Sequence, residues 1–125
     1  MRSISLRDFL LYEDEIVLFP RGVTIVTGRN GAGKSLLIDG IRLGLGMDPR
    51  SVRMDSLGAY VREGCQQAQI EITLSNPIED GERFISSGDL SFDVFLNQDS
   101  ITMRRSITRS GKSEFSIKAP NGRWA

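Results

Sequence analysis

One short stretch of the sequence has the residue types and the spacing of a phosphate-binding loop. It fits the pattern G-x-x-x-x-G-K-[ST] and consists of Gly28, Arg29, Asn30, Gly31, Ala32, Gly33, Lys34 and Ser35. Glycines let the backbone curl so that successive N–H groups point at phosphate oxygens, and a helix N-terminus adds positive partial charge. Lys34 is placed to reach the β- and γ-phosphates, and the Ser35 hydroxyl to bind Mg²⁺. The pattern predicts a site for ATP with Mg²⁺.

The segments on either side of the loop have the composition that such a site requires. Residues 23–27 form a β-branched run that is apolar on both faces, which predicts a buried central strand. Residues 35–45 place apolar side chains on one side of a helix. Gly44 and Gly46 weaken the end of that helix, and Pro49 prevents its continuation.

The remaining sequence is dominated by short strand patterns. An acidic turn is expected at residues 13–15, and a short helix begins at Asp55 or Ser56 and runs to Arg62. Residues 109–112 join the last two strands as a hairpin turn. The expected strands span residues 3–8, 16–19, 68–74, 101–108 and 114–118, with shorter ones near 84–85 and 92–96.

The composition excludes several kinds of chemistry. The 125 residues include no His, so a Ser-His-Asp triad and a His-ligated zinc site are impossible. Cys65 is the single cysteine, so an internal disulfide is excluded too. No apolar stretch approaches the roughly 20 residues of a membrane span, and no signal peptide is recognisable at the N-terminus. We expect a soluble, intracellular protein.

The formal net charge of zero conceals an uneven distribution. Residues 1–100 hold 10 basic and 15 acidic side chains, whereas residues 101–125 hold 6 basic side chains and one acidic one. Basic residues on a hairpin can bind DNA phosphates without reading the base sequence. The candidates are Arg104, Arg105, Arg109 and Lys112. The alternative is an ordinary solvated face. Arg105 falls on the opposite face of its strand, together with Met103 and Ile107, where its stem would pack along apolar surface and keep the charge in water.

Several motifs together resemble the N-terminal half of an SMC ATPase head. Asn30 within the loop is typical of ABC-type ATPases, including the SMC proteins. The stretch 22–35 followed by 41–46 resembles an SMC head, and residues 4–12 resemble its first strand. Residues 53–74 are similar to the fifth SMC type, the partner of the sixth type in the SMC-five/six complex. Residues 101–117 resemble its basic hairpin, and bacterial RecN repair ATPases show the second-best resemblance.

The resemblance implies an α/β fold of the P-loop NTPase class, the N-terminal lobe of an ABC-type ATPase head. A mixed sheet would surround the P-loop helix, and the basic hairpin would come last. Residues 1–125 would then be a fragment, because such a head also needs a coiled coil and a C-terminal lobe. Arg53 matches the position of the head's arginine finger, which reaches nucleotide phosphate. Phe9 and Tyr12 either approach the adenine ring or, as we expect, pack within the lobe.

The expected function is ATP-dependent DNA binding in chromosome maintenance and recombinational repair, within an SMC-five/six-type complex. Lys34 and Arg53 would serve catalysis, but only in the full-length protein, so the fragment alone should be inactive. The implied partners are DNA, the protein's own C-terminal lobe, a sixth-type SMC protein and kleisin-type subunits, with no membrane. The implied location is the nucleus and its chromosomes, or the cytoplasm for a RecN-type protein. A non-functional truncated product remains a further alternative.

Overall fold

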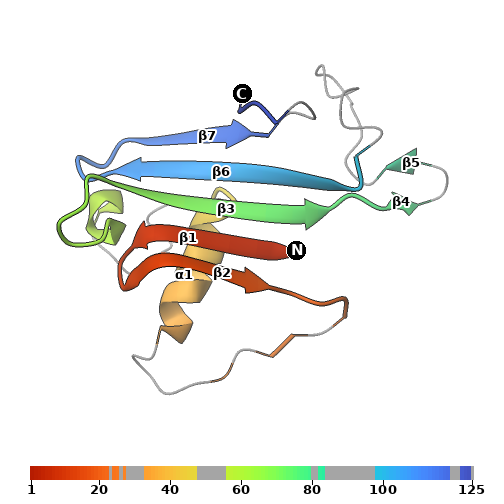
Figure 1. The fold of residues 1–125 in the computed structure, drawn as a ribbon, viewed down its shortest axis with the longest axis horizontal. Coiled ribbons are helices and arrows are strands. Elements are labelled where there is room, and N and C mark those ends of the chain that lie inside the picture. Colours follow the sequence, from red (N-terminus) through yellow and green to blue (C-terminus); the bar gives the residue numbers. More distant parts are fainter. Residues whose placement is uncertain are drawn as a thin grey trace.

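The fold is built on a five-stranded antiparallel sheet with one helix across one of its faces (Figure 1). The computed structural model describes residues 1–22, 24–25, 27, 33–47, 56–79, 82–83, 98–118 and 122–124. The order of strands across the sheet is β2-β1-β3-β6-β7. These strands are β1 (Ser3–Phe9), β2 (Tyr12–Leu18), β3 (Gln67–Ser75), β6 (Ser100–Thr108) and β7 (Ser113–Ile117). Every pairing between them is antiparallel.

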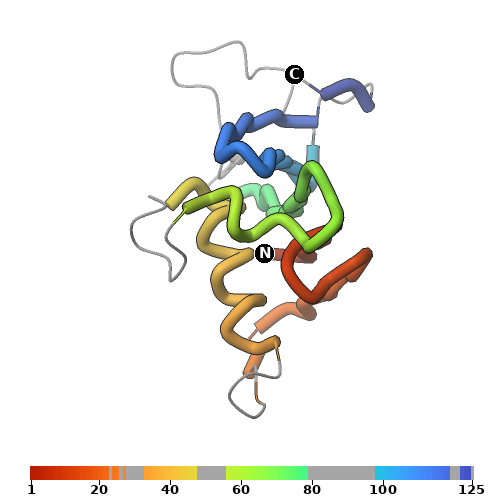
Figure 2. Tube along the Cα trace, turned by 90° about the vertical axis from the view of Figure 1, so that its left-hand side faces the viewer, coloured from red at the N-terminus to blue at the C-terminus, as the bar shows by residue number. Residues whose placement is uncertain are grey.

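The other described elements are short apart from the helix. Helix α1 spans Lys34–Gly44, and a single 3-10 turn, η2, spans Leu57–Tyr60. Two-residue strands β4 (Ile78–Glu79) and β5 (Glu82–Arg83) pair as a small separate hairpin. In the view of Figure 2, α1 lies along one side of the sheet. Among the described residues, no helix has the length and apolar character needed to cross a membrane.

The alternation of side chains along the central strands gives the sheet one apolar and one polar face. On β3, Ala68, Ile70 and Ile72 are fully buried, while the side chains between them face the opposite side. Ile4 and Leu6 of β1 are buried on the same face as these residues because they pair with Ile72 and Ile70. The hydrophobic core therefore lies between this face of the sheet and α1.

Two glycines allow α1 to approach the sheet closely. A Cβ atom at Gly40 would lie 2.9 Å from Cδ2 of Leu6, and one at Gly44 would collide with Ile72 and come within 2.9 Å of Cγ2 of Ile70. Gly44 was expected to weaken the end of the helix. The helix does end at Gly44, and this residue is also buried, because its missing side chain makes room for the two isoleucines.

Most of the longer elements agree with the prediction. The helix expected over 35–45 is observed one residue earlier at each end, and the strand expected over 68–74 is confirmed as β3. The predicted hairpin is confirmed as β6 and β7 with its turn between Thr108 and Ser113. The helix expected from Asp55 or Ser56 to Arg62 is reduced to the 3-10 turn η2. Asp55 and the strands expected near 84–85 and 92–96 lie outside the described residues.

Two predictions for the N-terminal region are wrong. The acidic residues 13–15 lie within β2, and the turn is formed by Leu10 and Leu11. An edge strand tolerates consecutive charged residues because one side of it faces solvent. In the run 23–27, Thr24, Ile25 and Thr27 are described, they belong to no strand, and Ile25 is 78% exposed. A strand apolar on both faces needs cover on both, and Ile25 is too exposed to have it.

Candidate nucleotide-binding site

The structure describes the last part of the predicted phosphate-binding loop. Gly33, Lys34 and Ser35 lie where the loop enters α1. The rest of the predicted loop, Gly28, Arg29, Asn30, Gly31 and Ala32, lies outside the described residues, and so does Arg53. Lys34 is the first residue of α1 and Ser35 the second, so both belong to the turn where backbone N–H groups lack intrahelical acceptors.

Gly33 has the backbone conformation that only glycine adopts readily. Its φ is +91° and its ψ is −10°, and it stands at the N-cap position of α1 without any side-chain cap. Its carbonyl accepts the first helical hydrogen bond, from the N–H of Leu37 at 2.9 Å. A helix start without a capping side chain leaves its positive end to an anion, which is the property that a phosphate site requires.

A tyrosine from the edge strand β2 holds this helix start. The hydroxyl of Tyr12 donates a hydrogen bond to the carbonyl oxygen of Gly33 at 2.9 Å. Burial, with a smaller contribution from the charge of Glu15, raises the pKa of Tyr12 above its ordinary value. The side chain therefore stays protonated and able to donate at any physiological pH. The sequence identified Tyr12 only as a packing or adenine-facing residue, because nothing in a local pattern reveals this contact.

The middle of α1 is held by a buried polar contact. Asp39 is 2% exposed, and the hydroxyl of Tyr60 in η2 donates to its Oδ2 at 3.3 Å. The Tyr60 ring stacks on the ring of Phe9, with a centroid distance of 5.3 Å. Phe9 is fully buried, so the prediction that it packs within the lobe is confirmed.

The C-terminal end of α1 is held by one of the predicted DNA-binding arginines. Nη1 of Arg105 in β6 donates to the carbonyl of Leu43 at 2.9 Å, and the guanidinium lies 4.7 Å from the centre of the Phe115 ring. Arg105 is 4% exposed, and this burial lowers the pKa of its guanidinium. DNA cannot reach a side chain enclosed in this way. The prediction of a DNA contact at Arg105 is therefore corrected: it faces the core with Ile107 and caps a helix.

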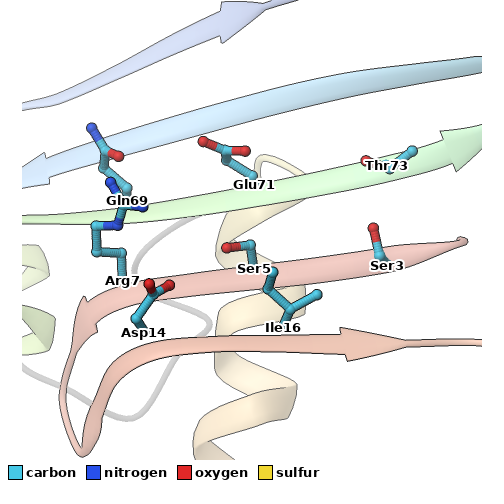
Figure 3. Close-up of a pocket in the computed structure, with 8 residues that line it drawn as sticks. All are labelled: Ser3, Ser5, Arg7, Asp14, Ile16, Gln69, Glu71 and Thr73. Atoms are coloured by element: carbon cyan, nitrogen blue, oxygen red, sulfur yellow. The ribbon is translucent and has the colours of Figure 1, made fainter.

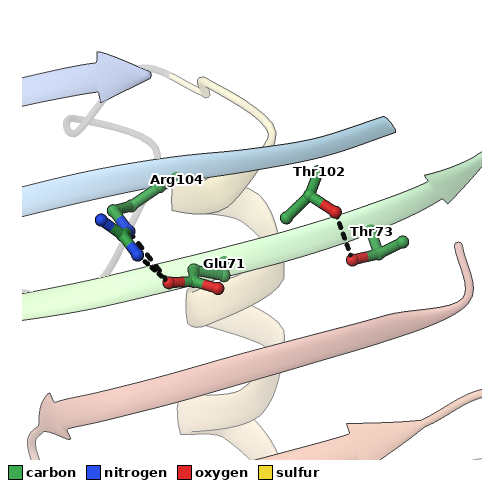
Figure 4. A network of polar contacts seen from close by, with 4 residues as sticks. All are labelled: Glu71, Thr73, Thr102 and Arg104. Carbon is green, nitrogen blue, oxygen red and sulfur yellow. Dashed lines mark hydrogen bonds and ion pairs between the residues drawn. The ribbon is translucent and has the colours of Figure 1, made fainter. Parts of the chain in front are cut away.

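The other three basic candidates lie on the outer face or on the hairpin turn. Arg104 donates from Nε and Nη2 to one carboxylate oxygen of Glu71, at 2.9 and 2.6 Å (Figure 4). Its guanidinium also lies 3.8 Å from the centre of the Trp124 ring. Arg109 donates to the carbonyls of Cys65 and Arg62 and is exposed, as is Lys112. The hairpin therefore brings Arg109 and Lys112 to the surface, while Arg104 already has an acidic partner.

The outer face of the sheet carries a polar groove that is separate from the start of α1. It has a volume of about 340 Å³. Strands β1, β2 and β3 contribute its lining, whose side chains are Ser3, Ser5, Arg7, Asp14, Ile16, Gln69, Glu71 and Thr73 (Figure 3). On β1 and β3 these side chains alternate with the buried ones, so the groove and α1 are on opposite faces of the sheet.

The model of the AAA domain family matches residues 3–123 of this chain. Structural maintenance of chromosomes protein 6 of Saccharomyces cerevisiae is 30% identical over 124 residues, covering 98% of this chain and 10% of that protein. The DNA repair protein RecN of Bacillus subtilis is 34% identical over 114 residues, covering 90% and 18%. Structural maintenance of chromosomes protein 5 of Caenorhabditis elegans is 34% identical over 74 residues, covering 58% and 7%. The chain thus spans less than a fifth of the length of these relatives.

Solved structures of SMC proteins have a similar fold. A chain from work on the ATP-driven dimerization and DNA-stimulated activation of SMC ATPases superposes with a TM-score of 0.74 at 25% identity, covering 99% of this chain and 70% of that chain. An Smc head bound to the C-winged helix domain of ScpA gives 0.72 at 21% identity, covering 99% and 36%. The chain therefore belongs to the AAA domain family, among the SMC-type ATPases, and has the fold of the N-terminal lobe of their heads.

Proposed function

We propose that this chain is the ATP-binding N-terminal lobe of a chromosome-maintenance and DNA-repair ATPase. The observation that carries the proposal is the start of α1, where a glycine in the left-handed conformation precedes Lys34 and Ser35 without a side-chain cap. The sequence of the loop that leads into this turn supplies the remaining backbone donors. Names of the relatives support the repair role, since RecN is called a DNA repair protein.

The described residues at the start of α1 have the chemical groups that bind ATP and Mg²⁺. Lys34 would bind the β- and γ-phosphates as a cation, and the Ser35 hydroxyl would be a ligand of Mg²⁺. Mg²⁺ supplies charge neutralisation on the phosphates when it is bound. Gly28, Arg29, Asn30, Gly31 and Ala32 would provide the rest of the phosphate cradle, and Arg53 would reach the phosphates as an arginine finger. The resemblance to SMC heads supports these last roles.

Hydrolysis of ATP should require more than this lobe. Phosphoryl transfer to water needs a further metal-positioning carboxylate and a group that orients the water. In the proposed architecture these come from the protein's own C-terminal head lobe, which a long coiled coil connects to the present lobe. We expect residues 1–125 alone to have no ATPase activity.

The proposed partners follow from the same architecture. DNA would contact the exposed basic groups of the β6–β7 turn, Arg109 and Lys112, with Arg104 beside them and without sequence specificity. A sixth-type SMC protein and kleisin-type subunits would complete an SMC-five/six-type complex on nuclear chromosomes. A kleisin is suggested by the ScpA-bound Smc head among the similar structures. The second candidate is a cytoplasmic RecN-type repair ATPase, favoured by the 34% identity to RecN over 114 residues.

The test is a binding titration of MgATP to the intact protein and to its Lys34→Ala variant. Loss of a charged phosphate contact should weaken binding by roughly ten- to a hundredfold. Lys112→Ala is the matched control, since it removes an exposed lysine far along the chain on the hairpin turn. The control should bind MgATP as the parent does. An unchanged dissociation constant for Lys34→Ala, with the parent binding, would overturn the proposed site.

A further inference from the structure

The carbonyl of Gly33 accepts two hydrogen bonds, one from the helix and one from the sheet. The N–H of Leu37 reaches it at 2.9 Å and the hydroxyl of Tyr12 at 2.9 Å. A carbonyl oxygen has two lone pairs, so these two donors use both of them. Its direction is therefore fixed from two independent elements, α1 and β2.

The direction of this carbonyl also sets the direction of the next N–H group. A peptide unit is planar and trans, so its C=O and N–H point in opposite directions. The C=O of Gly33 and the N–H of Lys34 belong to the same unit. The bond from Tyr12 draws the carbonyl oxygen toward β2 and thereby aims the N–H of Lys34 away from β2. This N–H belongs to the helix start that would receive the phosphates.

Gly33 and Tyr12 also match each other in shape. A Cβ atom at position 33 would lie 2.6 Å from the Tyr12 hydroxyl oxygen, closer than atoms in contact allow. The hydroxyl thus occupies the space where any other residue would carry its side chain. The phenol itself is held in place because Tyr12 pairs with Phe9 across the β1–β2 turn, and Phe9 is fully buried.

We propose that Tyr12 is a positioning residue for the phosphate-binding loop, acting through the carbonyl of Gly33 on the backbone donors at the start of α1. This inference rests on the proposed function, because it needs that helix start to bind phosphate. Tyr12 would touch no part of the nucleotide. It would keep the peptide between Gly33 and Lys34 in the orientation that binds an anion, so that binding does not have to reorder it.

The test compares Tyr12→Phe with Tyr60→Phe in the intact protein. Both variants lose one hydroxyl next to α1 and keep the ring, and these are the two tyrosines of the chain. Tyr60 bonds to Asp39 in the middle of α1, so its variant reports a general loss of helix anchoring. The ligands are MgATP and inorganic tripolyphosphate, which has the phosphates without the nucleoside. Thermal unfolding without ligand is measured for each variant to confirm that it is folded.

Tyr12→Phe should weaken the binding of MgATP and of tripolyphosphate by the same factor, about three- to tenfold, as expected for one lost hydrogen bond. Tyr60→Phe should change both affinities by less than about twofold, the spread expected without a direct effect. The inference is overturned if Tyr12→Phe binds both ligands like the parent, or if the two tyrosine variants lose affinity equally. It is also overturned if only MgATP is weakened, since Tyr12 would then contact the nucleoside. The Lys34→Ala variant distinguishes failure of the Tyr12 inference from failure of the proposed function. If Lys34→Ala binds both ligands like the parent, the proposed function itself is contradicted.

Discussion

Nη1 of Arg105 lies 2.9 Å from the carbonyl oxygen of Leu43, which ties the central part of β6 to the last turn of the P-loop helix. Among the described residues, Arg105 has no carboxylate partner. Its Nε is buried and has no hydrogen-bond partner among them either. A positive charge at a helix C-terminus is favourable, whereas its burial costs solvation. The lowered pKa of this guanidinium reflects that cost.

Arg105→Ala should reduce the free energy of unfolding by about 2–4 kcal/mol, because it removes the cap of Leu43 and leaves a buried cavity beside Phe115. Urea unfolding of the protein measures the change. Arg104→Ala is the control one residue along, since its partly exposed pair with Glu71 should contribute at most about 1 kcal/mol. Equal losses for the two variants would show that Arg105 has no special structural role.

Gly44→Ala should also destabilise the protein, by about 1–3 kcal/mol, because the added methyl group overfills the contact with Ile70 and Ile72. Gly40→Ala is the comparison within the same helix. There the nearest atom is the end of the Leu6 side chain, and the gain in helix propensity of about 1 kcal/mol can offset the crowding. Thermal unfolding of both variants tests whether Gly44→Ala is the less stable of the two. A Gly44→Ala variant more stable than Gly40→Ala would contradict the prediction.

Lys112→Ala should reduce the salt dependence of DNA binding, because each phosphate contact releases about one counterion. The slope of log affinity against log salt should become shallower by about 1. Arg105→Met is the internal comparison, since its side chain is buried and should leave the slope unchanged. Fluorescence anisotropy with a labelled duplex at several salt concentrations gives the slopes. An unaltered slope for Lys112→Ala would remove this residue from the DNA surface.

Local sequence patterns predicted the elements in which buried residues recur at a regular spacing. The helix after the glycine-rich loop and the strand β3 both follow from regular spacing of apolar residues, and the hairpin turn follows from Ser110-Gly111. The glycine-rich motif before that helix has a fixed spacing of residue types, and its binding of phosphate stays a prediction. The prediction of a turn at the charged residues 13–15 was wrong for a different reason. These residues can lie in a strand because that strand is at the edge of the sheet, and a local pattern does not show the order of strands.

The contacts that hold the candidate site depend on residues distant in sequence. Tyr12 and Gly33 meet because β2 and the start of α1 are brought together in space, and no pattern in either segment indicates this. Arg105 is different, because it is two residues from Ile107 and therefore shares its face, which is the inner face of β6. The sequence therefore contained the signal for an inward-facing Arg105, although the basic character of residues 101–125 also favoured DNA binding.

The central claim is that the start of α1 binds the phosphates of a nucleotide, and a competition titration tests it most directly. The intact protein is titrated with ATP, ADP, AMP and adenosine, each with Mg²⁺, against a fluorescent ATP analogue. The account predicts that ATP and ADP compete well and that AMP and adenosine compete at least about a hundredfold more weakly, because the loop holds the β- and γ-phosphates. Adenosine competing as strongly as ATP would contradict it.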